Sequence, residues 1–280
     1  MSTMKTLSEF CSKLGETAKG LCKIAVQSRA VTKGSPRRPD SRIIILANGP
    51  SLRGTVDNRS DLLRESDTLA VNFFANTPEF NLIRPKYYVL ADPHFFKRLD
   101  QANVVTLWEN LRRASWPIRI FVPARYRRDA ELHLQGVRQV ETFNFVGVEG
   151  FGWFERLAYR SGLAMPRPRN VLIPAIMTAI RVGYGQIVLT GADHSWLETI
   201  RVNERNEVVS IQPHFYQDSK TEVNRSVSEY RGYRLHDILQ SFYTAFRSYH
   251  RVAEYASAVG VKIENATPGS YIDAFPRTEL

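Results

Sequence analysis

Arg42-Ile43-Ile44-Ile45-Leu46-Ala47-Asn48-Gly49-Pro50-Ser51 is the stretch that decides the fold of this chain. After Arg42 it runs as an unbroken apolar segment, which is typical of a strand buried on both faces of a parallel sheet. Gly49 then allows close approach of the backbone to a ligand, and Pro50-Ser51 suits the start of a helix whose amides face an anion. The loop is neither a G-x-G-x-x-G loop nor a Walker A loop, and alone it is equally typical of an ordinary strand-to-helix turn.

Short segments with strand character recur along the chain, separated by segments with helical spacing. Strands are expected at Thr68–Asn72, Tyr87–Asp92, Arg119–Pro123, Gln186–Asp193 and Val261–Asn265, with a small strand or loop at Asn206–Ile211. Helices are expected at 94–113, 171–184 and 234–259. This alternation predicts an α/β, Rossmann-like fold with a doubly wound, mainly parallel sheet. Residues 124–168, rich in arginine, glycine and aromatic residues, are expected to form a partly irregular insertion.

The N-terminal segment, residues 1–30, has the pattern of an amphipathic helix. Its apolar residues follow steps of three and four and comprise Leu7, Phe10, Cys11, Leu14, Ala18, Leu21, Cys22 and Ala25. Such a stripe packs on its own domain or on a second copy of the chain, or else lies on a membrane surface. Lysines at 13, 19 and 23 favour the membrane, whereas glutamates at 9 and 16 oppose it. Residues 31–41 form a basic linker with two prolines, and we place one domain at 42–280, starting near Ser41.

The composition and charge of the chain limit the classes of partner that we expect it to bind. The chain has 280 residues, of which 43% are apolar, and a formal net charge of +10, so it favours anionic partners such as nucleotide-linked substrates or lipid headgroups. The basic residues lie in small clusters and form no continuous arm, so nucleic acid is not expected as a partner. With two cysteines, Cys11 and Cys22, and no apolar run long enough for a membrane span, we expect a cytoplasmic protein. Contact with the inner face of the membrane would involve residues 1–30.

Polar residues follow several of the predicted strands at their carboxyl ends, where open parallel sheets bind ligands. Asn48 and Asn72 end the first two strands, and their carboxamides offer donors and acceptors to a base, a ribose or a phosphate, or else cap turns. Asp92 and His94 follow the third strand, and a later one is followed by Asp193, His194 and Trp196.

The acidic and histidine residues of these loops also resemble a metal cluster. However, no Asp-x-Asp follows a strand, and no histidine pair has the i,i+4 spacing of metal ligands. We therefore predict no metal, and we expect Asp193 to hold a loop or a ligand hydroxyl.

His236 is the candidate catalytic histidine. It begins a long helix whose apolar stripe comprises Leu235, Leu239, Phe242, Phe246, Tyr249, Ala253 and Ala256, and it lies off the centre of that stripe. An imidazole that titrates near neutral pH is a competent general base, although a histidine at a helix start is also common on protein surfaces. Tyr216 and Tyr233 offer hydroxyl donors to a phosphate, or else pack.

Five stretches match, in order, motifs of one known family: Ile43–Leu52, Ala70–Phe74, Leu90–Phe96, Gly183–Asp193 and Tyr233–His236. They resemble the bacterial sialyltransferases of glycosyltransferase family 42. They are similar also to a wider group of uncharacterised relatives that includes a 6-hydroxymethylpterin diphosphokinase-like family. The resemblance spans residues 42–265 in patches, and residues 1–41 lie outside it.

The resemblance implies a metal-independent, inverting glycosyltransferase that moves a sugar from a CMP-activated donor to a glycan or glycolipid acceptor, with no cofactor. It implies a mobile lid, which we place around 194–233. The implied nucleotide-binding residues are Asn48, Gly49, Pro50, Ser51, Asn72 and Asp193. His236 would deprotonate the acceptor hydroxyl, and Tyr233 with Tyr216 would stabilise the leaving phosphate. Asp92, His94 and Trp196 would line the acceptor side.

Two departures from the family are visible. Asn170-Val171-Leu172 stands where the sialyltransferases have a Thr-Ser-Gly element that handles the donor phosphate and carboxylate. His194-Ser195-Trp196 stands where they have a tyrosine, a form closer to the uncharacterised relatives. Two alternatives therefore stay open: an ATP- and Mg²⁺-dependent phosphotransferase in which Asp92 and Asp193 serve the metal, and a non-catalytic nucleotide- or polyanion-binding protein.

Overall fold

The computed structural model describes residues 2–209 and 232–280, and its centre is a parallel sheet. The seven strands follow the order β5-β4-β3-β2-β1-β6-β9, and every neighbouring pair is parallel. They are β1 (Arg38–Leu46), β2 (Thr68–Val71), β3 (Tyr87–Val89), β4 (Arg119–Pro123), β5 (Gln139–Phe143), β6 (Tyr184–Thr190) and β9 (Lys262–Asn265). The predicted doubly wound, Rossmann-like α/β fold is confirmed.

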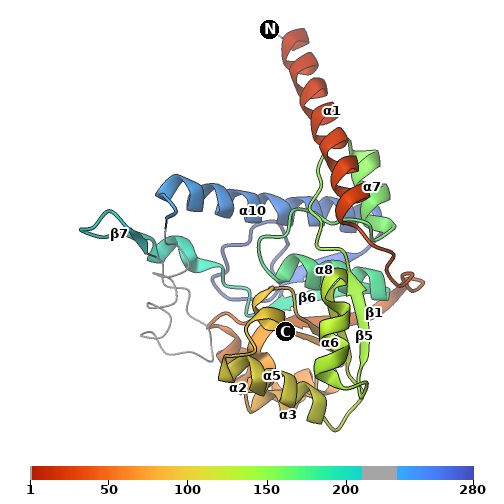
Figure 1. Cartoon of the computed structure of the whole chain (residues 1–280), viewed down its shortest axis with the longest axis vertical. Helices are drawn as coiled ribbons and strands as arrows, with labels where there is room; N and C mark the ends of the chain where they lie inside the picture. The colour runs from red at the N-terminus through yellow and green to blue at the C-terminus, as the bar shows by residue number, and fades with distance from the viewer. Residues whose placement is uncertain (1, 210–231) are drawn as a thin grey trace.

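Helices cover both faces of this sheet (Figure 1). They are α2 (Leu52–Glu65), α3 (Glu79–Ile83), α4 (His94–Lys97), α5 (Ala102–Arg113), α6 (Arg127–Leu134), α7 (Gly152–Arg160), α8 (Leu172–Val182) and α10 (Leu235–Ala258). Short 3₁₀ turns are η1 (Asn72–Asn76), η2 (Ala124–Tyr126) and η3 (Ser195–Thr199), and a small antiparallel hairpin joins β7 (Arg201–Val202) to β8 (Val208–Val209).

The apolar run in β1 explains the two-faced core. Alternate side chains of a strand point to opposite faces, so Ile43 and Ile45 enter a core with α7, α8 and α10. Ile44 and Leu46 enter a second core with α2, α3, α5 and α6. All four residues are at most 1% exposed. A strand between two helical layers needs apolar residues at every position.

Strand order places the ligand-binding edge. The chain builds β1 to β5 in one direction and then returns to add β6 on the other side of β1, with Ile44 opposite Val188. The carboxyl ends of β1 and β6 therefore flank the point where the winding reverses. In open α/β sheets this reversal leaves a crevice in which ligands bind.

Residues 124–168 contain more regular structure than we predicted. They hold α6, β5 and α7, so the expectation of a partly irregular insertion is wrong for much of this range. Strand β5 is at the edge of the sheet and carries the polar residues Gln139, Glu141 and Thr142. Glu141 pairs with Arg119 of β4, which stabilises a strand that has no apolar run.

The first strand begins at Arg38, inside the segment that we assigned to the linker. Its first half is largely exposed and pairs with β6 through an irregular register, so no apolar pattern marks it. The Arg38 guanidinium lies 4.7 Å from the ring centroid of Tyr184, a cation–π contact that anchors this end.

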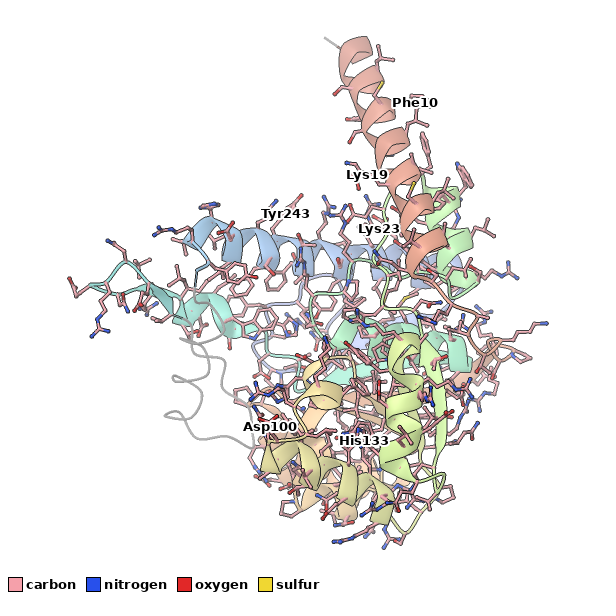
Figure 2. All side chains as sticks on the ribbon, viewed as in Figure 1. Phe10, Lys19, Lys23, Asp100, His133 and Tyr243 are labelled. Carbon is pink, nitrogen blue, oxygen red and sulfur yellow. The ribbon has the colours of Figure 1, made fainter. Side chains whose placement is uncertain are left out.

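The predicted N-terminal helix is present as α1 (Ser2–Gln27), which extends away from the sheet (Figure 1). Its apolar stripe is exposed: Leu7, Leu14 and Leu21 are each more than half exposed, so the expectation that this stripe packs on its own domain is wrong. Within the stripe, Phe10 contacts the body, with its ring centroid 5.4 Å from that of Phe151. Thr17, which is outside the stripe, accepts a hydrogen bond from the Phe151 amide. Figure 2 shows Phe10 on one side of α1 and Lys19 and Lys23 on the other. No helix among the described residues is long and apolar enough to cross a membrane.

Candidate functional site

A cavity of about 460 Å³ opens at the carboxyl ends of the central strands. We call it the first cavity. Seven of the predicted site residues line it, although they come from four separate loops: Asn48, Gly49, Pro50, Asn72, Asp92, Asp193 and Trp196. Ser51 lies beside it and contacts Asp193. The structure therefore brings most of the predicted nucleotide-binding set together.

The loop after β1 is held by the protein's own carboxylate. Asp193 accepts hydrogen bonds from the Ser51 amide (3.2 Å) and the Ser51 hydroxyl (2.8 Å). Burial raises the pKa of Asp193, and the two hydrogen bonds from Ser51 oppose that shift. The anion that the Ser51 amide faces in this structure is therefore the Asp193 carboxylate. The expectation that Asp193 holds a loop is confirmed.

Gly49 must be glycine for a steric reason. A side-chain Cβ at this position would overlap Asp193 Oδ2 and would lie 2.6 Å from the carbonyl oxygen of Gly191. The Gly49 amide donates to that same carbonyl at 2.8 Å, so the loops after β1 and β6 are joined directly.

The two asparagines have partly structural roles. Asn48 is buried, and its Nδ2 donates to the Val71 carbonyl (3.0 Å), which ties the end of β1 to the end of β2. Asn72 has a left-handed backbone (φ 52°), a conformation that asparagine tolerates better than most residues. Its carbonyl accepts a hydrogen bond from the Tyr88 hydroxyl at 2.5 Å. Among the described residues, nothing donates a hydrogen bond to Asn72 Oδ1, which is buried at the cavity.

Three residues outside the predicted site set form a polar network at the first cavity, and two of them, Asn170 and His194, line it. The Tyr249 hydroxyl contacts His194 Nε2 at 2.5 Å and Asn170 Oδ1 at 3.1 Å, and Asn170 Oδ1 also accepts from the Leu172 amide at 3.0 Å. Burial lowers the pKa of His194 to about 3, so its ring is neutral at ordinary pH. Because it accepts a hydrogen bond from the Leu172 amide, Asn170 caps the start of α8. It stands where the sialyltransferases that the sequence resembles have Thr-Ser-Gly.

Asp92 and His94 differ in position. Asp92 is exposed at the first cavity and accepts a hydrogen bond from the His94 amide (2.8 Å) through Oδ1. The His94 ring instead packs edge-on against Phe73 (centroids 6.3 Å apart), and His94 is not among the residues that line the cavity.

A second cavity of about 550 Å³ adjoins the first. The two share four lining residues: Arg169, Asn170, Trp196 and Ser241. Tyr233 lines this second cavity, together with Asp237 and Gln240 of α10. The predicted phosphate-stabilising Tyr233 therefore lies on the far side of the shared rim from Asn48 and Asn72.

His236 does not line either cavity. Its side chain is 81% exposed in the first turn of α10, and its Nε2 lies 3.4 Å from Asp237 Oδ1. Tyr216 lies outside the described residues. The proposed lid at 194–233 is described only in part, as η3 and the β7–β8 hairpin.

The residues that sequence reasoning missed carry weak local patterns. Asn170 was noted only as a departure, and Arg169 beside it is one arginine among many. Ser241, Thr244 and Ser248 interrupt the apolar stripe of α10, and two of these, Thr244 and Ser248, are buried. Small hydroxyls on the inner face of a helix were the available sign that α10 borders a polar cavity.

In the part of the chain that the structure describes, no group of three or more histidine, cysteine, aspartate or glutamate side chains could hold a metal ion.

Comparison with known proteins gives limited guidance. No family model and no curated protein matches the chain. The structure is similar to that of the MAf glycosyltransferase from Magnetospirillum magneticum AMB-1, with 9% sequence identity and a TM-score of 0.48. The similarity covers 95% of this chain and 38% of that protein, so the chain spans less than half of its length. A similarity at this level assigns no activity to this chain.

Proposed function

We propose that this protein is a glycosyltransferase that uses a CMP-activated sugar and needs no metal. The observation that carries the proposal is the first cavity, where residues of four loops meet at the reversal of the strand order. These residues include Asn48 and Asn72, which the resemblance implies bind the CMP moiety. Asn72 Oδ1 is buried without a donor among the described residues, and a ribose hydroxyl or the amino group of cytosine would supply one.

Arg169 supports the placement of the phosphate. It lies on the rim between the two cavities, and no carboxylate of the described residues forms an ion pair with it. Asp193 already occupies the start of α2, and Asn170 already caps α8. A guanidinium matches the geometry of phosphate oxygens, so the leaving CMP would sit against Arg169.

The reaction would be a single displacement. An acceptor hydroxyl attacks the anomeric carbon, the bond from that carbon to the phosphate oxygen breaks, and CMP leaves as a phosphate monoester. The hydroxyl proton passes to a general base. The resemblance gives this role to His236, which reaches the rim only if the first turn of α10 turns inward. Asp92 is the competing base, because it lines the first cavity whereas Asp193 is bound to Ser51 and His194 has a depressed pKa.

Thermal shifts with CMP, CTP, UDP, GDP, ADP and ATP, each with and without Mg²⁺, test the donor class. A ligand that binds only the folded state raises the melting temperature. We expect CMP to stabilise the protein without metal. Stabilisation only by ATP with Mg²⁺ would support the phosphotransferase alternative, and the absence of any shift would reject nucleotide binding.

Substitution of the two candidate bases separates them. We expect His236→Ala to abolish transfer and to leave CMP binding intact, with a loss of at least about 100-fold in rate. Asp92→Asn is the matched variant. If Asp92→Asn abolished transfer and His236→Ala did not, Asp92 would be the base.

A glycolipid acceptor would suit the exposed stripe of α1. We propose that this stripe rests on the inner, cytoplasmic face of a membrane, supported by the exposure of Leu7, Leu14 and Leu21 and by the lysines on the same helix. Flotation with anionic phospholipid vesicles tests this, with Leu14→Glu expected to release the protein. Dimerisation that Leu14→Glu abolishes, without vesicle binding, would assign the stripe to a second copy instead.

A further inference from the structure

The second cavity is joined to the first through a narrow set of residues. Arg169, Asn170, Trp196 and Ser241 line both. In a transfer reaction the two substrates must meet at one reacting bond, held within van der Waals reach. If the first cavity holds the donor nucleotide, this shared rim is the place where the anomeric carbon and the attacking hydroxyl meet, and the second cavity lies on the side from which the hydroxyl arrives.

The lining of the second cavity has the chemistry of a sugar site. Trp196 presents an indole, which lies with its centroid 4.2 Å from that of His194 and 5.2 Å from that of Phe242, so its position is fixed by neighbours. Gln240 and Ser241 provide an amide and a hydroxyl, and neither side chain forms a hydrogen bond with another described residue. An aromatic plane beside hydrogen-bonding groups fits a pyranose, whose C–H face is apolar and whose edge carries hydroxyls.

The charges around this cavity favour an uncharged acceptor. Glu149 pairs with both Arg167 and Arg247, and Arg167 also pairs with Glu16 at 2.7 Å, so these two arginines are neutralised. On the α10 side, Asp237 contributes a carboxylate to the lining, accepts a hydrogen bond from the Arg234 amide at 2.9 Å and lies 3.4 Å from His236 Nε2. The Asp237 carboxylate on this wall repels an anionic substituent of the acceptor. Arg169 at the rim would not attract that substituent, because it would be paired with the leaving phosphate.

We infer that the second cavity is the acceptor site and that it takes a neutral pyranose at the end of a glycan or glycolipid. The sugar lies against Trp196 and donates to or accepts from Gln240 and Ser241, with its nucleophilic hydroxyl directed to the rim at Arg169. This inference rests on the proposed function for its role, but the sugar site itself can be tested without any donor.

The probe is a set of methyl glycosides, namely methyl glucoside, galactoside and mannoside, observed by saturation-transfer NMR with CMP at saturation. We expect at least one to bind the wild-type protein, and the methyl glycoside of a hexuronic acid to bind more weakly than its neutral counterpart. Gln240 is exposed at the second cavity, so a larger side chain at this position would fill that cavity. Gln240→Trp should therefore weaken glycoside binding at least about tenfold. The melting temperature and the shift caused by CMP should stay unchanged.

Tyr243→Trp is the matched control. Tyr243 lies on the same helix, is 60% exposed, lines neither cavity and points away from the body (Figure 2). It should leave glycoside binding as in the wild type. The inference is overturned if no glycoside binds wild type that binds CMP, or if Gln240→Trp and Tyr243→Trp behave alike. Glycoside binding that Gln240→Trp removes in a protein that ignores CMP would instead retain the sugar site and reject the proposed function.

Discussion

The two sides of the cleft are built differently. On the sheet side, the polar groups of Asn48, Ser51 and Asp193 are bonded to the protein itself, by contacts between 2.8 and 3.2 Å. On the helix side, the side chains of Arg169 and Gln240 make no hydrogen bond or ion pair with any other described residue. The difference teaches that Asn48, Ser51 and Asp193 give the cleft its shape, whereas the side chains of Arg169 and Gln240 are available for ligand chemistry. Substitutions should therefore affect folding on one side and binding on the other.

The sheet side is tested most severely at Gly49. Gly49→Ala places a Cβ against Asp193 Oδ2 and the Gly191 carbonyl, so the two loops must separate. We expect a loss of about 3 kcal/mol in the free energy of unfolding, measured by urea denaturation. Gly54→Ala is the control, because a Cβ there meets nothing within 4 Å. Equal stability of the two variants would contradict the comparison.

The helix side should show the opposite behaviour at Arg169. Arg169→Gln removes the guanidinium from the shared rim, and we expect a loss of about 2 kcal/mol in CMP binding, roughly thirtyfold in Kd. The melting temperature should not change, because no described residue depends on this side chain. Arg113→Gln on α5, an exposed arginine outside both cavities, is the control for net charge. A fall in stability without a change in Kd would place Arg169 among the structural residues.

The smallest of these effects, when it is expressed per pH unit, is a dependence of the stability on pH that comes from His194. In the folded protein its ring takes up a proton only near pH 3, whereas in the unfolded chain it does so near pH 6.5. Between these values the unfolded state binds one more proton, so the stability falls as the pH falls, by about 1.4 kcal/mol per pH unit.

Comparison with His194→Gln isolates this contribution from those of other groups. The free energy of unfolding should be measured by urea denaturation at several values between pH 4 and 7. The wild type should lose stability more steeply than the variant as the pH falls. Parallel profiles would show that His194 is not buried in its neutral form.

Much of the sheet could be predicted from the sequence. Arg119–Pro123 has the predicted bounds, because a strand covered on both faces must be apolar throughout. Strand β5 escaped prediction because an edge strand needs no such run, and its Glu141 is explained only by Arg119 on the neighbouring strand. The stripe of α1 was recognised as helical, but periodicity shows that a face is apolar and not what covers it.

The site was predictable where it depends on strand ends and not where it depends on loops that approach each other. Asn48 and Asn72 lie in one cavity because parallel strands end at the same edge. Arg169 and Ser241 belong to segments that the fold brings together across a long stretch of chain, and no local pattern distinguishes them. His236 is exposed in the first turn of α10, and helix propensity does not determine which way a side chain of that turn faces.

The contact between the loops after β1 and β6 has a consequence for how this protein can evolve. A Cβ at Gly49 would overlap Asp193 Oδ2 and the Gly191 carbonyl oxygen. Gly191 has a φ of 69°, and a Cβ there would overlap the Ala47 carbonyl oxygen and Leu52 Cβ. A side chain at either position would overlap these atoms, so neither glycine can be replaced unless the two loops move apart. Asp193 accepts hydrogen bonds from both the backbone amide and the hydroxyl of Ser51, and only the hydroxyl bond depends on residue 51 being a serine. In an alignment of homologues, the two glycines should be invariant, whereas Ser51 need not be.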